Sequence, residues 1–113
     1  PPIVVVLSAT TVPAGAVAPA TFVASISGDG RAIVTQPLIG VSVQPDRALE
    51  LWAVPCQGAP RSLGLISASG ASVVKKNKLP AGTAALAVSL EPPGGSTTGA
   101  PTGPVLYVGK LAL

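Results

Sequence analysis

Glycine and proline interrupt this chain from end to end, with 13 of each among its 113 residues. Both residues break helices, glycine through its backbone freedom and proline through its missing N–H group. The runs between them are rich in valine, isoleucine, leucine and alanine, as in Ile3–Leu7. Because β-branched side chains fit a pleated surface, this pattern predicts many short strands joined by turns and almost no helix.

The spacing of these runs predicts an all-β fold, an antiparallel β-sandwich of immunoglobulin-like or Greek-key type with about eight short strands. Apolar and polar residues alternate most clearly over 84–91, where Ala87, Ser89 and Glu91 are expected to point outward. Residues 21–27 also alternate, with Phe22, Ala24 and Ile26 on one side, and Gly28-Asp29-Gly30 predicts a tight turn after this strand. The expected strands are residues 3–7, 21–27, 31–36, 48–54, 61–67, 72–75, 84–91 and 105–111, with a further short strand at 38–43.

The length of the chain fits one domain spanning residues 1–113. The sequence begins at Pro1 and contains no methionine, so we expect it to be a fragment of a longer protein. Its longest apolar run, Ile3–Leu7, is far shorter than the ~20 residues that span a bilayer. We therefore expect any membrane anchor to precede Pro1.

The chemistry available to the side chains is sparse. Histidine, the commonest general base and metal ligand, is absent. The lone Cys56 has no histidine partner, and the stretch Gly94–Gly99 lacks the Gly-Lys-Ser/Thr ending of a phosphate-binding loop. We expect no catalytic site, no cofactor and no metal. The four carboxylates are Asp29, Asp46, Glu50 and Glu91.

The net charge of +3 is too small and too scattered to indicate a nucleic-acid partner. The only basic cluster in the sequence is Lys75, Lys76 and Lys78, which is either a solvated turn or a contact for anionic lipid head groups or a partner. Trp52 is either a core anchor or part of an exposed contact face. The mean hydropathy of +0.62 and the sparse charge predict a weak homodimer, formed through an edge strand or a Trp52-containing face.

Three sequence motifs occur in order in the second half of the chain. Residues 50–55 and 61–65 read ELWAVP and RSLGL, residues 86–96 read LAVSLEPPGGS, and residues 101–109 read PTGPVLYVG. Together they resemble the signatures of the RskA-like anti-sigma-K factor family, in its C-terminal extracytoplasmic domain. The matching positions are Leu51, Trp52, Pro55, Ser62, Leu63, Gly64, Glu91, Pro92, Gly94, Gly95, Ser96, Pro101, Thr102, Gly103 and Pro104.

The resemblance implies a parent protein in three parts. A cytoplasmic segment would bind an extracytoplasmic-function sigma factor, a single transmembrane helix would follow, and this domain would lie on the periplasmic side. The family also implies release of the sigma factor by regulated proteolysis, with the first cut at the junction near Pro1 or in the loop Pro92–Pro104. We favour the junction. The alternative is a freestanding adhesion or ligand-binding β-sandwich module, which would need exposed aromatic residues or clustered carboxylates.

Overall fold

The computed structural model describes residues 1–75 and 79–111, and this part of the chain forms eight strands and no helix. The prediction of an all-β fold with about eight strands is therefore confirmed. The strands are β1 (Ile3–Ala9), β2 (Ala20–Ile26), β3 (Ala32–Pro37), β4 (Ala48–Pro55), β5 (Arg61–Ile66), β6 (Ser72–Lys75), β7 (Thr83–Glu91) and β8 (Val105–Lys110).

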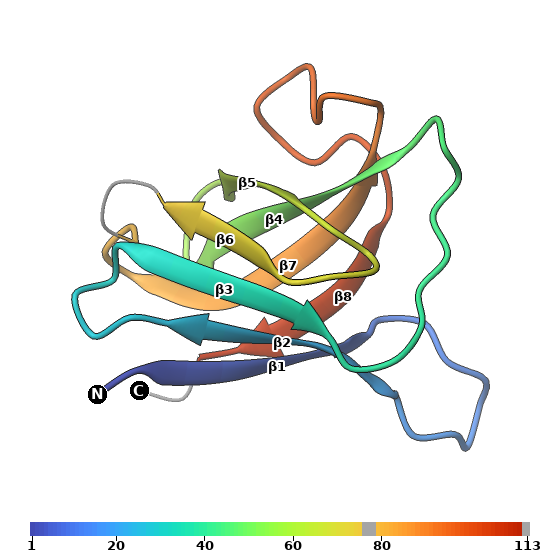
Figure 1. Ribbon diagram of the computed structural model, residues 1–113, viewed down its shortest axis with the longest axis horizontal. Helices are drawn as coiled ribbons and strands as arrows, with labels where there is room; N and C mark the ends of the chain where they lie inside the picture. Colours follow the sequence, from blue (N-terminus) through green and yellow to red (C-terminus); the bar gives the residue numbers. More distant parts are fainter. Residues whose placement is uncertain (76–78, 112–113) are drawn as a thin grey trace.

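All eight strands belong to one antiparallel sheet in the order β5-β4-β7-β8-β1-β2-β3-β6 (Figure 1). The sheet curls until its two edge strands, β5 and β6, come into contact. The predicted sandwich of two separate sheets is therefore replaced by one nearly closed, barrel-like sheet. The register shifts once in each of the β1–β2, β4–β5, β4–β7 and β7–β8 pairs, and each shift leaves one extra residue, on β2, β5, β7 and β8 in turn. These irregularities promote the curl, because an extra residue bends and twists the strand that holds it.

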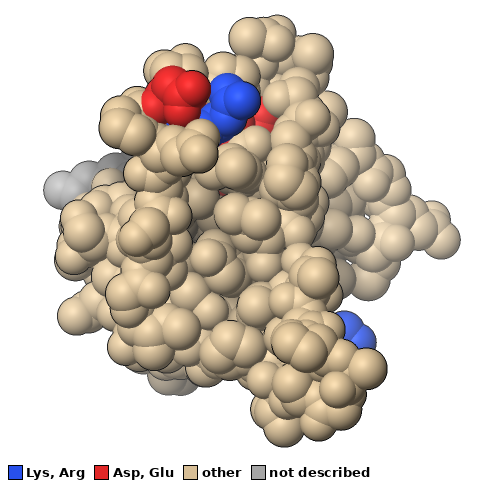
Figure 2. Space-filling model, turned by 90° about the vertical axis from the view of Figure 1, so that its right-hand side faces the viewer, with Lys and Arg blue, Asp and Glu red and all other residues tan. Residues whose placement is uncertain are grey.

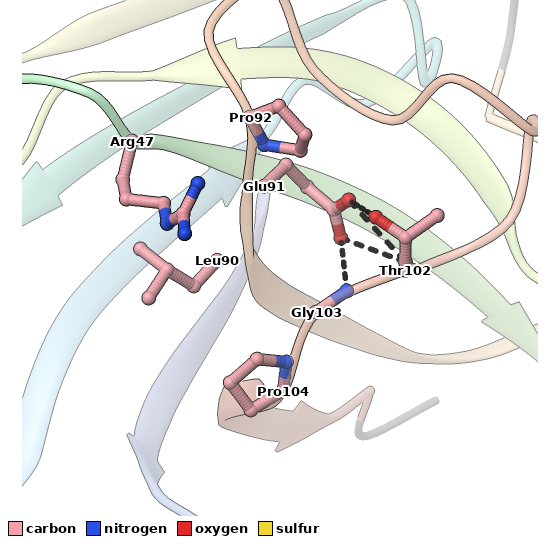
Figure 3. A pocket seen from close by; sticks show the side chains of 7 residues that line it. All are labelled: Arg47, Leu90, Glu91, Pro92, Thr102, Gly103 and Pro104. Atoms are coloured by element: carbon pink, nitrogen blue, oxygen red, sulfur yellow. Dashed lines mark hydrogen bonds between the residues drawn. The ribbon is translucent and has the colours of Figure 1, made fainter.

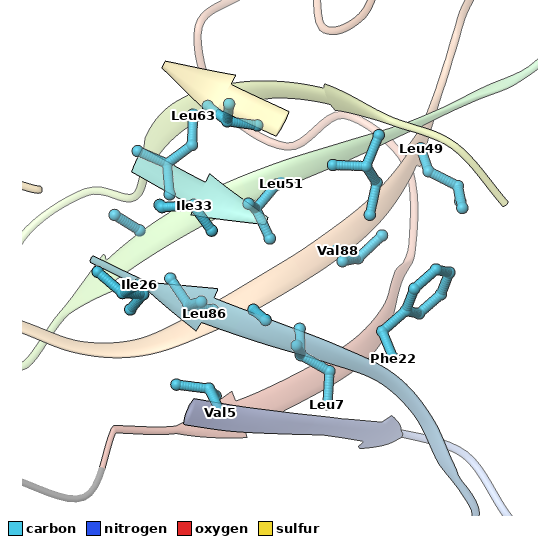
Figure 4. Packing of buried hydrophobic residues seen from close by; sticks show 14 residues of the cluster. Val5, Leu7, Phe22, Ile26, Ile33, Leu49, Leu51, Leu63, Leu86 and Val88 are labelled. Atoms are coloured by element: carbon cyan, nitrogen blue, oxygen red, sulfur yellow. The ribbon is translucent and has the colours of Figure 1, made fainter. Parts of the chain in front are cut away.

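The inside of the curled sheet is filled by aliphatic side chains and one phenylalanine (Figure 4). Eight strands enclose a space that side chains alone can fill, so the interior is a packed core. Phe22 and Ile26 point into it, as the alternation over 21–27 predicts. The core residues are Val5, Leu7, Phe22, Ala24, Ile26, Ile33, Leu49, Leu51, Ala53, Leu63, Ile66, Val74, Leu86 and Val88.

The short strand predicted at 38–43 is not formed. Pro37 ends β3, and residues 38–47 follow as an irregular connection to β4. Leu38 and Ile39 are each about half exposed there, so they do not join the core. The apolar run misled the prediction because composition alone does not say whether a partner strand is within reach.

The two ends of the curled sheet differ in what they hold. Pro1, the end of β8 at Lys110 and the β2–β3 turn lie at one end, which we call the terminal end (Figure 1). The long connections at residues 10–19, 38–47 and 92–104 lie at the other, which we call the loop end. The strand pairing fixes this arrangement, since β1 and β8 are antiparallel neighbours.

Candidate functional site

Four polar or amphipathic side chains on β4 and β7 point away from the core and are nevertheless buried. Glu50 and Trp52 alternate with the core residues of β4, and Ser89 and Glu91 alternate with those of β7. Trp52 and Ser89 have no exposed surface, and Glu91 and Glu50 are 1% and 6% exposed. The prediction that Ser89 and Glu91 point outward is right about direction, but this outer face is covered.

Glu91 is the centre of one hydrogen-bonded group, which we call the Glu91 clamp: Ser89, Glu91, Thr102 and Gly103. The Ser89 hydroxyl donates to Glu91 Oε2 at 2.6 Å, and the Thr102 and Gly103 amides donate to the same oxygen at 3.1 and 3.3 Å. The Thr102 hydroxyl donates to Oε1 (Figure 3). These bonds tie the returning part of the loop to the end of β7.

Trp52 extends this group across the sheet. Its indole Nε1–H donates a hydrogen bond to Ser89 Oγ at 2.8 Å. The Ser89 hydroxyl therefore accepts one hydrogen bond from Trp52 and donates another to Glu91. The indole is thus fully buried with its one donor satisfied, as a buried tryptophan requires. The expectation of Trp52 as a buried anchor is confirmed, although it packs outside the main core. An exposed face containing Trp52 is excluded.

Glu50 holds the same loop at a second place, which we call the Glu50 clamp: Glu50, Ser62 and Ser96. The Ser62 hydroxyl on β5 donates to Glu50 Oε2, and the Ser96 amide donates to Oε1 at 2.7 Å. The two carboxylates lie on one face of neighbouring strands, because Glu50 pairs with Ser89, two residues before Glu91. Each binds a different part of residues 92–104.

Two glycines let the loop come this close to the sheet. Gly95 has a φ of +97°, and a Cβ added there would lie 2.9 Å from Glu50 Oε1. A Cβ at Gly103 would collide with the backbone carbonyl oxygen of Leu90. Since backbone cannot yield as a flexible side chain can, Gly103 is the tighter requirement.

The hydrogen bonds decide the charge state of Glu91. Burial raises the pKa of the Glu91 carboxyl, but the bonds from Ser89, Thr102 and Gly103 together outweigh burial and hold the pKa below its ordinary value of 4.5. Glu91 is therefore ionised at neutral pH. A buried carboxylate that accepts several hydrogen bonds is a strong tie between the segments that donate them.

The sequence motifs meet around these two clamps. Leu51 and Leu63 face the core, while Gly64, with a φ of +124°, lies opposite Leu51 at a bulge. Pro55 ends β4, and the Pro104 carbonyl accepts a bond from the Leu90 amide. The motif residues in or beside the clamped loop are Glu91, Pro92, Gly94, Gly95, Ser96, Pro101, Thr102, Gly103 and Pro104.

Sequence reasoning missed Glu50 and Ser89 as members of the site. Both lie within the quoted motifs, yet each resembles an ordinary polar residue on the outer face of a strand. The signal that could have found them is that the motifs combine two acids in predicted strands, Glu50 and Glu91, with several glycine, serine and threonine residues. These are short residues that offer backbone and hydroxyl donors to a carboxylate.

The chemistry of the clamps is structural. Each Glu91 oxygen already accepts hydrogen bonds from the protein, which leaves little capacity for a substrate. An open hollow of about 360 Å³ adjoins the clamp, with Arg47 on its rim (Figure 3). Among the described residues, no three Cys, Asp or Glu side chains gather closely enough to hold a metal ion. Cys56 is an exposed free thiol in the β4–β5 turn.

The predicted basic cluster is only partly within the described residues. Lys75 ends β6, whereas Lys76 and Lys78 lie outside the described residues. In residues 1–75 and 79–111 we find no helix that could cross a membrane.

The fold and the clamps define a class of protein first: a small all-β domain whose buried polar groups hold a long loop against the sheet. The chain belongs to the family described as "Anti-sigma-K factor rskA, C-terminal", whose model matches residues 1–105. The resemblance carried by the three motifs is thereby confirmed. The family places the chain in an anti-sigma factor, a regulator of transcription whose partner is a sigma factor. Comparison with curated proteins and with solved structures finds no match.

Proposed function

We propose that this chain is the extracytoplasmic regulatory domain of a membrane-anchored anti-sigma factor, and that its folded state restrains the proteolysis that releases the sigma factor. The observation that carries the proposal is the family match over residues 1–105. On this proposal the sigma-binding residues lie elsewhere in the parent, and the domain regulates without catalysing a reaction.

The clamped loop supports a restraining role. A protease needs an extended and accessible segment, and paired strands do not offer one. The loop 92–104 is the longest connection rich in glycine, and both clamps hold its backbone against the sheet. The junction near Pro1 therefore stays the favoured place for the first cut, with a regulatory protease as the partner there.

The test uses the full-length parent in its own cells. Deleting the domain should raise sigma-dependent transcription without the inducing signal, because the restraint is gone. Gly103→Ala should do the same, since it disrupts the fold in place. Gly15→Ala is the matched control, because a Cβ at Gly15 meets no atom within 4 Å. Low transcription that still needs the signal after domain deletion would refute the proposal.

The weak homodimer stays a prediction, but its proposed contact surface can no longer include Trp52, which is buried. Val4 and Val73 are more than half exposed on the outer face of the sheet, and the pairing places Val34 between them on β3. These valines replace Trp52 as the candidate contact. Sedimentation velocity at high protein concentration checks it, and a strict monomer would remove the idea.

A further inference from the structure

The basic residues of this chain gather at the terminal end of the sheet. Arg61 begins β5 and shares a row of paired residues with Gly109, which precedes Lys110 at the end of β8. On the other half of the sheet, Arg31 precedes Ala32, which pairs with Lys75 at the end of β6. Arg31, Arg61 and Lys110 are exposed. The fold thus brings together cations that lie far apart in the sequence.

The acidic residues do not balance this end. Glu50 and Glu91 are buried in the clamps, and Asp46 lies beside Arg47 at the loop end. Of the described acidic residues, Asp29 alone lies at the terminal end, in the β2–β3 turn, where it accepts bonds from Ser27 and the Arg31 amide. The three exposed cations Arg31, Arg61 and Lys110 of the terminal end are therefore set against one described anion.

The loop end presents the opposite surface. Arg47 is the one basic residue there among the described residues. Figure 2 faces this end, and almost all of the surface that it shows is uncharged. The net charge of +3 is therefore spread unevenly, and the excess of positive charge lies at the terminal end, where Pro1 lies.

We propose that the terminal end is a docking surface for an anionic lipid bilayer. The proposal rests on the proposed function, in which the membrane anchor precedes Pro1 and so turns this end toward the lipid. A basic residue near an anionic membrane surface gains roughly a fivefold increase in binding, and the gain is lost beyond a Debye length. A tether at the same end keeps the cations within that distance.

Charge complementarity favours lipid over a nucleic acid. Single-stranded nucleic acid binds where basic residues are interleaved with exposed aromatic rings. Here Trp52 and Phe22 are buried and Tyr107 is partly buried against the core. Exposed cations without aromatic neighbours suit phosphate head groups on a surface, where no base needs to stack. Docking would hold the domain close to the bilayer and shield the junction near Pro1.

The test measures binding of the chain to vesicles of phosphatidylglycerol mixed with phosphatidylcholine, and to vesicles of phosphatidylcholine alone. We expect binding only to the mixed vesicles, falling as salt is added. Combined Arg31→Gln, Arg61→Gln and Lys110→Gln should weaken binding about 100-fold, since each lost cation costs about fivefold. Arg47→Gln removes the same charge at the loop end and should leave binding nearly unchanged. Circular dichroism confirms that all variants fold.

Two results would overturn the proposal. If Arg47→Gln weakens binding as much as each terminal-end substitution does, net charge and not this surface is responsible. If the chain does not bind mixed vesicles at low salt, the terminal end is not a docking surface for lipid. Neither result depends on release of a sigma factor, so failure here is distinct from failure of the proposed function.

Discussion

Two loops of similar composition behave differently in this molecule. Residues 10–19 join β1 to β2 and residues 92–104 join β7 to β8, and both are uncharged and rich in proline and threonine. Within the first, Ala16 donates to the Pro13 carbonyl, and Val17 is 90% exposed. The second is held by Glu50 and Glu91. Composition therefore does not decide how firmly a loop is held; acceptors on the neighbouring strands do.

The two loops are held differently because only residues 92–104 lie next to buried acidic side chains. The outer faces of β4 and β7 supply two carboxylates directly beneath residues 92–104. No acidic residue occurs in β1, β2 or the loop between them. Backbone N–H groups of the first loop have no such acceptor, so solvent must satisfy most of them. The following predictions test this comparison.

The largest effect should come from Gly103→Ala. The new Cβ would collide with the Leu90 carbonyl oxygen, and the Leu90 amide already binds the Pro104 carbonyl, so the whole return path must shift. We expect the free energy of unfolding to fall by about 4 kcal/mol or more. Urea denaturation measures it. A cost no larger than that of Gly15→Ala would mean that the close approach is unimportant.

Glu91→Ala should come next. It removes the acceptor for Ser89, Thr102 and Gly103, and of these donors Ser89 is fully buried. We expect a loss of about 3 kcal/mol in the free energy of unfolding, because an unsatisfied buried donor costs about 1–3 kcal/mol and the bonds that Thr102 and Gly103 make to a charged acceptor are lost as well. Asp46→Ala, at an exposed acid near the same end, is the control and should change stability little. Equal effects of the two substitutions would contradict a structural role for the clamp.

Acid should loosen the Glu91 clamp less severely than the substitution, because protonation removes the charge but keeps the side chain. The pKa of Glu91 is lower in the folded chain than its ordinary value of 4.5. A group of this kind stabilises the fold above the unfolded pKa, and that contribution is lost as pH falls through the folded pKa. Stability should therefore decline below about pH 4.5. Glu91→Gln should lose less on acidification, and parallel pH profiles for the two proteins would argue against the assignment.

The smallest effects should come from a matched pair, Gly15→Ala and Gly99→Ala. Both glycines have a φ of +81° and neither has an atom within 4 Å of an added Cβ. Each substitution should cost about 1 kcal/mol, which is the strain of a left-handed backbone at alanine. Equal costs in denaturation would show that the tip of the clamped loop is as open as the first loop. A much larger cost at Gly99 would extend the tight region beyond the clamps.

Much of the fold could be predicted from the sequence because it depends on local rules. The alternation at 21–27 placed Phe22 and Ile26 in the core, and Gly28-Asp29-Gly30 forms the predicted turn, with a φ of +74° at Gly30. These signals depend on neighbours in the chain, so no tertiary information was needed. The run at 38–43 failed because its interpretation as a strand required a partner that the chain does not place there.

The candidate site could be predicted only in part. The motifs pointed to Glu91 and Thr102, but nothing in the spacing said that the Thr102 backbone would donate to the Glu91 carboxylate. Glu50 was recognised as an acid in a strand and no more. Its role depends on Ser62 and Ser96, which are distant in sequence and come together only when β4, β5 and the loop are assembled.

By itself, then, the sequence determined the eight strands that form, the turn at 28–30, the inward faces of the strands at 21–27 and 84–91, and the family. Only the tertiary structure decided that eight strands make one curled sheet, that Trp52 is buried outside the core, and that the basic residues share one end. The physical reason is the distance along the chain over which each effect acts. Side-chain alternation and turn chemistry act over a few residues, whereas curvature, burial of the outer face and the summed charge of one end depend on which strands become neighbours.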